Sequence, residues 1–315
     1  MSVKDLKKYF ATKRGLLHAV DGVSFSIRRG ETLGLVGESG CGKSTLGRCL
    51  IRLLDATSGS VVLHGETDVD VTKASESAMK ELRKKVQIVF QDPYSCLNPR
   101  LSVWELIAEP LIVNRVFPSG AAMRKRVREL MSTVGLAERL ENSYPHELDG
   151  GRRQRIGIAR SLALSPEFIV LDEPVSALDV CIQAQILNLL NSLQREFHYT
   201  YVFISHNLSV VRHVSDRISV MYLGKIVETA DYDALFAHPA HPYTQALLSA
   251  IPVARLDVKK ERILLEGDVP SPIEPPDCCR FAGRCRFRDD ECLRGTPELR
   301  EVGPNHLAAC FKVGA

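Results

Sequence analysis

The segment from Gly37 to Ser44 reads Gly-Glu-Ser-Gly-Cys-Gly-Lys-Ser, which is the full spacing of a phosphate-binding loop. It lies between an apolar run over 32–36, which predicts a buried strand, and a stretch over 45–50 that predicts a helix. Glycines let backbone N–H groups curl around a di- or triphosphate, and the helix N-terminus favours negative charge. An ordinary Gly-rich turn is the alternative, which the full spacing disfavours. The loop therefore predicts a nucleoside triphosphate site.

Two side chains of this loop carry the charge and the metal contact. In such loops the Lys43 ammonium reaches the outer phosphates and the Ser44 hydroxyl ligates Mg²⁺. The residues expected to hold the nucleotide here are Gly37, Glu38, Ser39, Gly40, Cys41, Gly42, Lys43, Ser44 and Thr45.

A second candidate site follows a distant apolar run over 168–171, where Asp172 and Glu173 stand side by side. Side chains alternate along a strand, so we expect the two carboxylates to point differently and to do different work. Asp172 suits a direct or water-mediated Mg²⁺ contact, and Glu173 suits the general base that prepares water for attack on the γ-phosphate. Two solvated loop acids are the ordinary alternative, but the upstream phosphate loop favours the functional interpretation.

Further motifs appear in a fixed order along the chain. Gln91 follows an apolar strand over 86–90, Leu148-Asp149-Gly150-Gly151-Arg152 precedes the acidic strand, and Asp179 and His206 come after it. A lone Gln or His after a strand is more often structural, but the whole series at this spacing is specific. In this order the chain resembles the ATP-binding subunit of an ABC transporter over essentially its whole length.

Three segments narrow the resemblance. The sequences over 92–100, 172–185 and 238–248, the last reading His-Pro-Ala-His-Pro-Tyr-Thr-Gln-Ala-Leu-Leu, resemble the oligopeptide/dipeptide/nickel importer family. Of the two paired ATPases in that family, the chain is more similar to the second, or F-type, subunit.

The expected fold is α/β. It has a phosphate-loop NTPase core with a mostly parallel sheet, an antiparallel β subdomain, a helical signature subdomain and a small C-terminal cysteine-containing extension. We expect the core over 1–92 and 161–235, the helical subdomain over 93–160 and the extension over 236–315.

Several local features are expected within these boundaries. They are antiparallel strands over 3–27 with a turn at Asp21-Gly22, helices over 101–113 and 121–134, and a Pro-rich linker over 269–276. The chain begins almost inside its first strand, so either that strand is short or the start is displaced.

Composition limits the partners and the compartment. A net charge of +3 over 315 residues is too mild to predict nucleic acid or an anionic membrane surface as a partner. No apolar run approaches the roughly 18 residues of a membrane-spanning helix, and no signal peptide opens the chain. Other chains must therefore supply any membrane path. Nine cysteines without a secretory signal indicate a reducing compartment.

The resemblance implies roles for single residues. Gln91 would touch the metal or the attacking water and report nucleotide state to membrane subunits, and His206 would hydrogen-bond the γ-phosphate. Asp179 would lie at the seam of an ATPase dimer. Phe10, or Tyr9 beside it, would stack on adenine, although an aromatic residue in a first strand is more often core.

Asp149 departs from the family pattern, which has Ser at this position. In the family this position, with those of Gly150 and Gly151, begins a helix that faces the γ-phosphate of the partner's nucleotide. Asp caps a helix about as well as Ser, but about 4 Å from a phosphate charge it would be repelled by roughly 4 kcal/mol at a dielectric near 20. We therefore expect a heterodimer in which this chain's own nucleotide is hydrolysed. A carboxylate that turns to solvent and only caps is the alternative. Arg152, which replaces the usual Gln, could partly neutralise Asp149.

The tail holds Cys279, Cys285, Cys292 and Cys310, which match four cysteines of many relatives. Four thiolates suit a [4Fe–4S] cluster, which the resemblance favours. A structural zinc with His306 as a candidate ligand and ordinary free thiols stay open, and neighbouring Cys278 leaves the first ligand ambiguous. Because the tail lies outside the nucleotide motifs, we expect ATP binding to survive replacement of these cysteines, while assembly with the membrane partners weakens.

The expected function is an ATPase that uses ATP and Mg²⁺ to energise import of peptides or a related small solute. It would sit peripherally on the cytoplasmic face of the membrane, with a homologous ATPase, two transmembrane permease subunits and, indirectly, an extracytoplasmic solute-binding protein. The alternative is a soluble ABC-type ATPase that acts on nucleic acid or ribosomes. Such proteins usually carry long coiled-coil insertions or two fused nucleotide domains, which this chain lacks. The solute is selected by the other subunits.

Overall fold

The computed structural model describes residues 1–65, 67–117, 120–251 and 262–313. The chain forms two compact units, which are described separately below. The first unit comprises Met1–Lys73 and Phe203–Ala315, and the second comprises Ala74–Val202.

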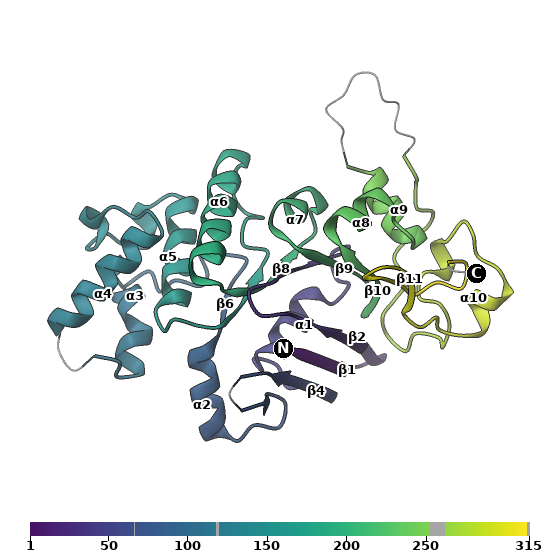
Figure 1. The fold of residues 1–315 in the computed structure, drawn as a ribbon, viewed down its shortest axis with the longest axis horizontal. Helices are drawn as coiled ribbons and strands as arrows, with labels where there is room; N and C mark the ends of the chain where they lie inside the picture. The colour runs from purple at the N-terminus through teal and green to yellow at the C-terminus, as the bar shows by residue number, and fades with distance from the viewer. Residues whose placement is uncertain (66, 118–119, 252–261, 314–315) are drawn as a thin grey trace. The chain divides into compact units, whose positions relative to one another are not determined.

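The first unit contains an antiparallel sheet in the order β2-β1-β4-β5 (Figure 1). The strands are β1 (Ser2–Thr12), β2 (Gly15–Ser26), β4 (Ser58–Leu63) and β5 (Val69–Asp70). The first strand is therefore not short. The predicted turn at Asp21-Gly22 is wrong, because the hairpin turns at 13–14 and β2 continues through both residues. Gly22 has a φ of 71°, which allows an irregular pairing register inside the strand.

A second sheet in this unit carries the phosphate loop. Its strands are ordered β11-β12-β10-β9-β3. The bounds are β3 (Thr32–Val36), β9 (Arg217–Tyr222), β10 (Lys225–Asp231), β11 (Arg300–Gly303) and β12 (His306–Ala308). β3 pairs in parallel with β9, but β10 pairs antiparallel with β9 and β12, and β12 pairs antiparallel with β11. The sheet is therefore mixed, which corrects the expectation of a mostly parallel one. Every residue of β3 is buried, as its apolar sequence predicts.

The second unit pairs β6 with β7 in parallel and adds a cluster of helices. Its elements are α2 (Glu76–Lys85), β6 (Val86–Val89), α3 (Val103–Val113), α4 (Gly120–Thr133), α5 (Gly150–Leu162), β7 (Phe168–Asp172) and α6 (Val180–Phe197). The helices predicted over 101–113 and 121–134 are confirmed. Helix α3 starts at a capping box in which the Ser102 hydroxyl and the Glu105 carboxylate each accept the other residue's backbone N–H. The division between the units falls inside β8 (Thr200–Ser205), which is fully buried.

The C-terminal extension completes the first unit with short helices. The helices of the first unit are α1 (Lys43–Leu50), α7 (Leu208–Val214), α8 (Tyr232–Ala237), α9 (Pro242–Ser249) and α10 (Asp290–Arg294). Figure 1 shows the extension, in yellow-green to yellow, continuing from β10 through α8 and α9 to the C-terminus. Among the described residues no helix combines the length and the apolar character that crossing a bilayer requires.

The segment expected to be a Pro-rich linker pairs with β2 instead. An isolated antiparallel bridge joins Leu17 to Ile273. The His18 N–H donates to the Pro272 carbonyl at 2.9 Å, and the Glu274 N–H donates to the Leu16 carbonyl at 2.9 Å. This stretch is therefore an added edge of the antiparallel sheet, and the linker prediction is wrong there.

Candidate nucleotide-binding and catalytic site

The phosphate loop has the backbone geometry that its glycines predict. Gly42 caps α1 with a φ of 105°, and a Cβ there would lie 2.0 Å from the Ala19 carbonyl oxygen. A Cβ on Gly37 would lie 2.1 Å from the Met221 carbonyl oxygen. Only glycine fits either position, so the path of the loop is fixed by the close approach of neighbouring backbone.

Lys43 is buried in this loop, with 4% of its surface exposed. Its ammonium donates to the carbonyls of Gly37 and Glu38, both at 2.9 Å. These bonds hold the ammonium inside the curve of the loop, where phosphate oxygens would enter. Ser44 and Thr45 follow on the first turn of α1, and Cys41 is buried within the loop, where burial raises the pKa of its thiol.

Of the two adenine candidates in β1, Tyr9 is already engaged. Its hydroxyl donates to Asp21 at 2.5 Å and its ring stacks on His18 with 3.9 Å between centroids. Phe10 is half-buried, and the Lys8 ammonium lies over its ring, 4.9 Å from the centroid.

In the second unit, β7 ends at the predicted acidic pair. Asp172 is 1% exposed, whereas Glu173 is half-buried, so the two side chains differ as expected. Glu173 has a φ of 48°, a conformation uncommon outside glycine and typical of constrained functional positions. The Gln91 amide donates to the Glu173 carboxylate at 3.1 Å. The structure thus brings together Gln91 and Glu173, two residues 82 positions apart. His206, in the first unit, follows β8 and is exposed.

Asp149 acts as the N-cap of α5. Its carboxylate accepts the Arg152 N–H at 2.8 Å, and the Arg152 guanidinium lies 3.4 Å from its other oxygen. Both side chains are about half exposed, so this ion pair contributes little energy and the cap is the main effect. Gly150 and Gly151 begin the helix, and a Cβ on Gly151 would lie 2.6 Å from Ile182 of α6. This agrees with the interpretation of Asp149 as a capping residue.

Asp179 caps α6 in the same way, accepting the Ile182 N–H at 3.0 Å. The next residue, Val180, is 80% exposed.

The four tail cysteines lie near one another. Burial raises the pKa of Cys279 to about 11, and the proximity of Cys292, Cys310 and Cys285 raises it further. The Lys312 N–H donates to the Cys310 sulfur at 3.4 Å. The described residues nevertheless include no group of three or more His, Cys, Asp or Glu side chains placed to hold a metal ion. The thiols are thus neighbours without being in ligating positions.

Two further residues, Cys278 and His306, were alternative candidates for metal ligands in the tail. The Cys278 thiol donates to the Cys279 carbonyl at 3.8 Å. His306, the candidate zinc ligand, is buried and places its Nε2 at 2.7 Å from the Glu228 carboxylate. His306 therefore has a structural partner in Glu228.

Sequence reasoning missed two residues that contact the phosphate loop from the extension. The Glu38 N–H donates to the Tyr243 hydroxyl at 2.9 Å, and the Arg284 guanidinium pairs with the Glu38 carboxylate at 2.8 Å. The extension therefore contacts the phosphate loop directly. Tyr243 belongs to the segment over 238–248 that resembles the oligopeptide/dipeptide/nickel importer family, but its contact was not predicted. No sequence signal pointed to Arg284.

Loop, sheet and acidic strand together define a phosphate-loop ATPase of the ABC class. Residues 20–176 match the ABC transporter family, and residues 227–292 match the C-terminal region of oligopeptide/dipeptide transporters. Among solved structures, the dimeric post-hydrolysis state of the ATP-binding cassette MJ0796 with ADP and Pi is similar. It has a TM-score of 0.67 and 31% identity over 73% of this chain and 98% of that one.

Curated relatives extend the similarity over the whole chain. The oligopeptide transport ATP-binding protein AppF of Bacillus subtilis is 51% identical, covering 98% of this chain and 96% of AppF. The dipeptide transport ATP-binding protein DppF of Escherichia coli is 49% identical, covering 98% and 93%. The chain belongs to the ATP-binding proteins of the oligopeptide/dipeptide ABC importers, and its motif-based resemblance to the F-type subunits is confirmed.

The cap at Asp149 gives a prediction on stability. Replacement of Asp149 by Ala should lower the free energy of unfolding by about 1 kcal/mol, because the Arg152 N–H loses its acceptor. Replacement by Ser should change it by only a few tenths, since Ser caps equally well. Urea unfolding of both variants checks this, and an Asp149→Ala variant as stable as the wild type would contradict the capping role.

Proposed function

We propose that this chain binds ATP and Mg²⁺ and hydrolyses ATP to energise import of peptides or a related small solute. It would act peripherally at the cytoplasmic face of a membrane. The observation that carries the proposal is the pairing of Gln91 with Glu173 at the end of β7, in a chain that also has a complete phosphate loop around Lys43. The names of AppF and DppF support peptides as the cargo.

The proposed roles follow from the chemistry of each side chain. Ser44, Asp172 and Gln91 offer hydroxyl, carboxylate and amide oxygens, the ligands that Mg²⁺ prefers, so these residues fit the ion. When bound, Mg²⁺ would neutralise phosphate charge. Glu173 accepts a proton from the attacking water, and Gln91 holds the Glu173 carboxylate in place. His206 orients the γ-phosphate.

We assign residues 1–92 and 161–235 to the nucleotide-binding core, 93–160 to the helical subdomain and 236–315 to the extension. The working form would be a heterodimer with a homologous ATPase, in which Asp179 and Val180 lie at the seam. The exposure of Val180 and the dimeric state named for the MJ0796 structure support this pairing. With Asp149 in only one of the two composite sites, this chain's own nucleotide is the one hydrolysed.

The Glu173→Gln variant tests the catalytic assignment. It should bind ATP as the wild type does and lose nearly all steady-state hydrolysis, because the amide keeps the shape but cannot accept the proton. ATP affinity and phosphate release measured on the assembled complex separate these two effects. The matched control is Glu196→Gln, an exposed acid on α6 that should keep full turnover. Wild-type turnover in Glu173→Gln would place the active site in the partner chain.

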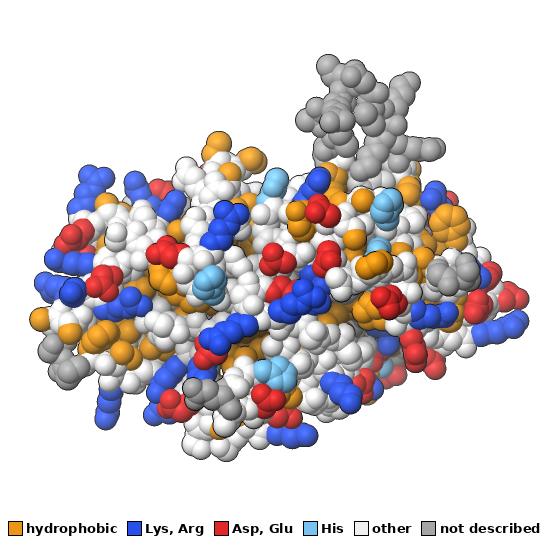
Figure 2. All heavy atoms as spheres, viewed as in Figure 1, with side chains coloured by type: hydrophobic (Ala, Val, Ile, Leu, Met, Phe, Trp, Pro, Cys, Tyr) orange, Lys and Arg blue, Asp and Glu red, His pale blue; other side chains and the backbone are white. Residues whose placement is uncertain are grey.

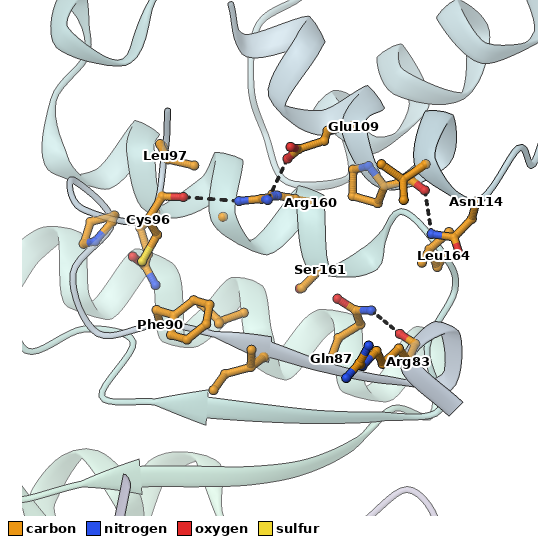
Figure 3. Close-up of a pocket in the computed structure, with 17 residues that line it drawn as sticks. Arg83, Gln87, Phe90, Cys96, Leu97, Glu109, Asn114, Arg160, Ser161 and Leu164 are labelled. Atoms are coloured by element: carbon orange, nitrogen blue, oxygen red, sulfur yellow. Dashed lines mark hydrogen bonds and ion pairs between the residues drawn. The ribbon is translucent and has the colours of Figure 1, made fainter. Parts of the chain in front are cut away.

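The surface beside Gln91 suits the permease subunits as partners. A cavity of about 380 Å³ lies in the second unit, lined partly by Phe90, Cys96, Val113 and Arg160 (Figure 3). Arg160 donates to the Cys96 carbonyl at 3.2 Å and pairs with Glu109 at 2.6 Å, so its charge is satisfied within the cavity. The apolar rim of the cavity is exposed to solvent, because 38% of Phe90 and 69% of Val113 are accessible.

Apolar exposure of this kind marks a contact with another chain. Figure 2 shows hydrophobic side chains gathered over the helical segment around α3, with acidic and basic groups interspersed around them. Phe90 directly precedes Gln91, so a membrane subunit seated in the cavity would touch the segment that holds Glu173. We propose that this cavity takes a segment of a permease subunit and thereby links transport to hydrolysis.

Replacement of Val113 by Asp should break this contact, because a carboxylate in the apolar rim stays hydrated and opposes burial. Co-purification of the importer complex should lose the two membrane chains, while ATP binding by the variant persists. Val116→Asp is the control, since Val116 is 46% exposed but does not line the cavity. Retention of the membrane chains by Val113→Asp would exclude the cavity as their docking surface.

We further propose that Cys279, Cys285, Cys292 and Cys310 hold a [4Fe–4S] cluster. Their mutual proximity supports the proposal, which requires the four thiols to move closer together than they lie in this structure. When bound, the cluster would cross-link separate segments of the extension, a structural contribution. His306 is engaged by Glu228, which weakens the zinc alternative that included it.

Protein prepared without oxygen should therefore contain about four iron and about four sulfide per chain. Replacement of Cys285, Cys292 or Cys310 by Ser should remove the iron, whereas Cys41→Ser should keep it, because Cys41 is buried in the phosphate loop. Metal analysis and visible absorbance measure this. Stoichiometric zinc, or no metal at all, would exclude the cluster.

A further inference from the structure

Glu38 of the phosphate loop is held at three points. Its carbonyl accepts the Lys43 ammonium at 2.9 Å within the loop. Its N–H donates to Tyr243 at 2.9 Å, and its carboxylate pairs with Arg284 at 2.8 Å. Two of the three contacts thus come from the C-terminal extension, more than 200 residues further along the chain.

Tyr243 and Arg284, the two residues that contact Glu38 from the extension, are themselves held in place by packing. Tyr243 is fully buried and packs on Tyr222 of β9, with ring centroids 4.7 Å apart, and on Phe281 at 5.5 Å. Tyr222 meets Phe281 edge-on at 5.3 Å, which closes the cluster. Burial raises the pKa of Tyr243 above its usual range, so its hydroxyl stays neutral. Arg284 follows Phe281 by three residues, and its side chain is 9% exposed.

The segment from Cys279 to Cys285 makes a second ion pair with the first unit. Arg280 pairs with Asp21 of β2, which also lies 3.5 Å from the Lys225 ammonium. Burial opposes ionisation of Asp21, but the Tyr9 hydrogen bond and these two cations lower its pKa below the usual value. Both arginines of this short segment therefore anchor it to the nucleotide-binding unit.

Charge gives the Glu38 contact a consequence for the ligand. A carboxylate in a phosphate-binding loop repels the triphosphate, and the nearby Arg284 cation cancels that charge. The Tyr243 hydroxyl at the same time fixes the direction of the Glu38 N–H. Removal of Arg284 would leave a negative charge beside the phosphates and free one side of the loop.

We propose that the C-terminal extension positions the phosphate loop through Glu38, with Arg284 and Tyr243 as positioning residues for ATP. This rests on the nucleotide site proposed above and adds a role for the extension in it. Because coupling between sites is reciprocal, bound ATP also stabilises the extension.

The test measures the ATP·Mg²⁺ dissociation constant of the full chain by calorimetry. Arg284→Ala should weaken binding about tenfold, within the range of ordinary coupling between sites. Arg284→Lys should keep most of the affinity because it keeps the charge. Arg286→Ala is the matched control, since Arg286 is exposed, lies two residues away and contacts Phe287 rather than Glu38.

A double-mutant cycle distinguishes positioning from general stability. In a Glu38→Gln background, Arg284→Ala should change affinity no further, because the charge that it neutralises is gone. Tyr243→Phe should speed hydrogen exchange at the Glu38 amide while leaving the aromatic cluster packed. Unchanged affinity in Arg284→Ala, or an equal loss with and without Glu38, would overturn the inference. A wild-type chain that binds no ATP would instead overturn the proposed function.

Discussion

One fully buried carboxylate, that of Glu228 on β10, joins the extension to the nucleotide-binding sheet. It accepts the Ala240 N–H at 2.7 Å, the His241 N–H at 2.9 Å and the His306 ring nitrogen at 2.7 Å. A buried charge is tolerated only when its lone pairs are satisfied, so the entry to α9 and the strand β12 must both be in place. The contact of Tyr243 with the phosphate loop depends on this anchor, because α9 carries Tyr243.

The parts of the site that could be predicted from sequence are those formed by short-range rules. The phosphate loop, the buried strand β7 and the helices α3 and α4 follow from glycine spacing, apolar runs and caps within a few residues. The turn predicted at Asp21-Gly22 was wrong because a glycine in a strand irregularity has the same local signature as a glycine in a turn. The Pro-rich segment at Ile273 pairs with β2 for a tertiary reason that its composition does not show.

Contacts between segments far apart in the chain could not be predicted from the sequence. Arg284 and Glu38 are 246 residues apart, and neither belongs to a motif that mentions the other. The sequence analysis assigned Gln91 to the metal or the attacking water and did not predict its pairing with Glu173. For Asp149 the sequence predicted a helix cap, which the bond to the Arg152 N–H confirms, but the sequence of a cap is the same whether or not its carboxylate also faces a phosphate.

The position of Lys43 changes how nucleotide capture should be understood. The ammonium has three donors: two serve the carbonyls of Gly37 and Glu38, and the third serves the Cys41 sulfur at 3.7 Å. When a phosphate binds, the ammonium therefore exchanges one acceptor for another. The net gain in free energy is the difference between its hydrogen bond to an anionic phosphate oxygen and its hydrogen bond to the acceptor that it leaves. A loop that satisfies its own lysine in this way also keeps a buried cation stable while the site is empty, so the chain can fold before it meets its ligand.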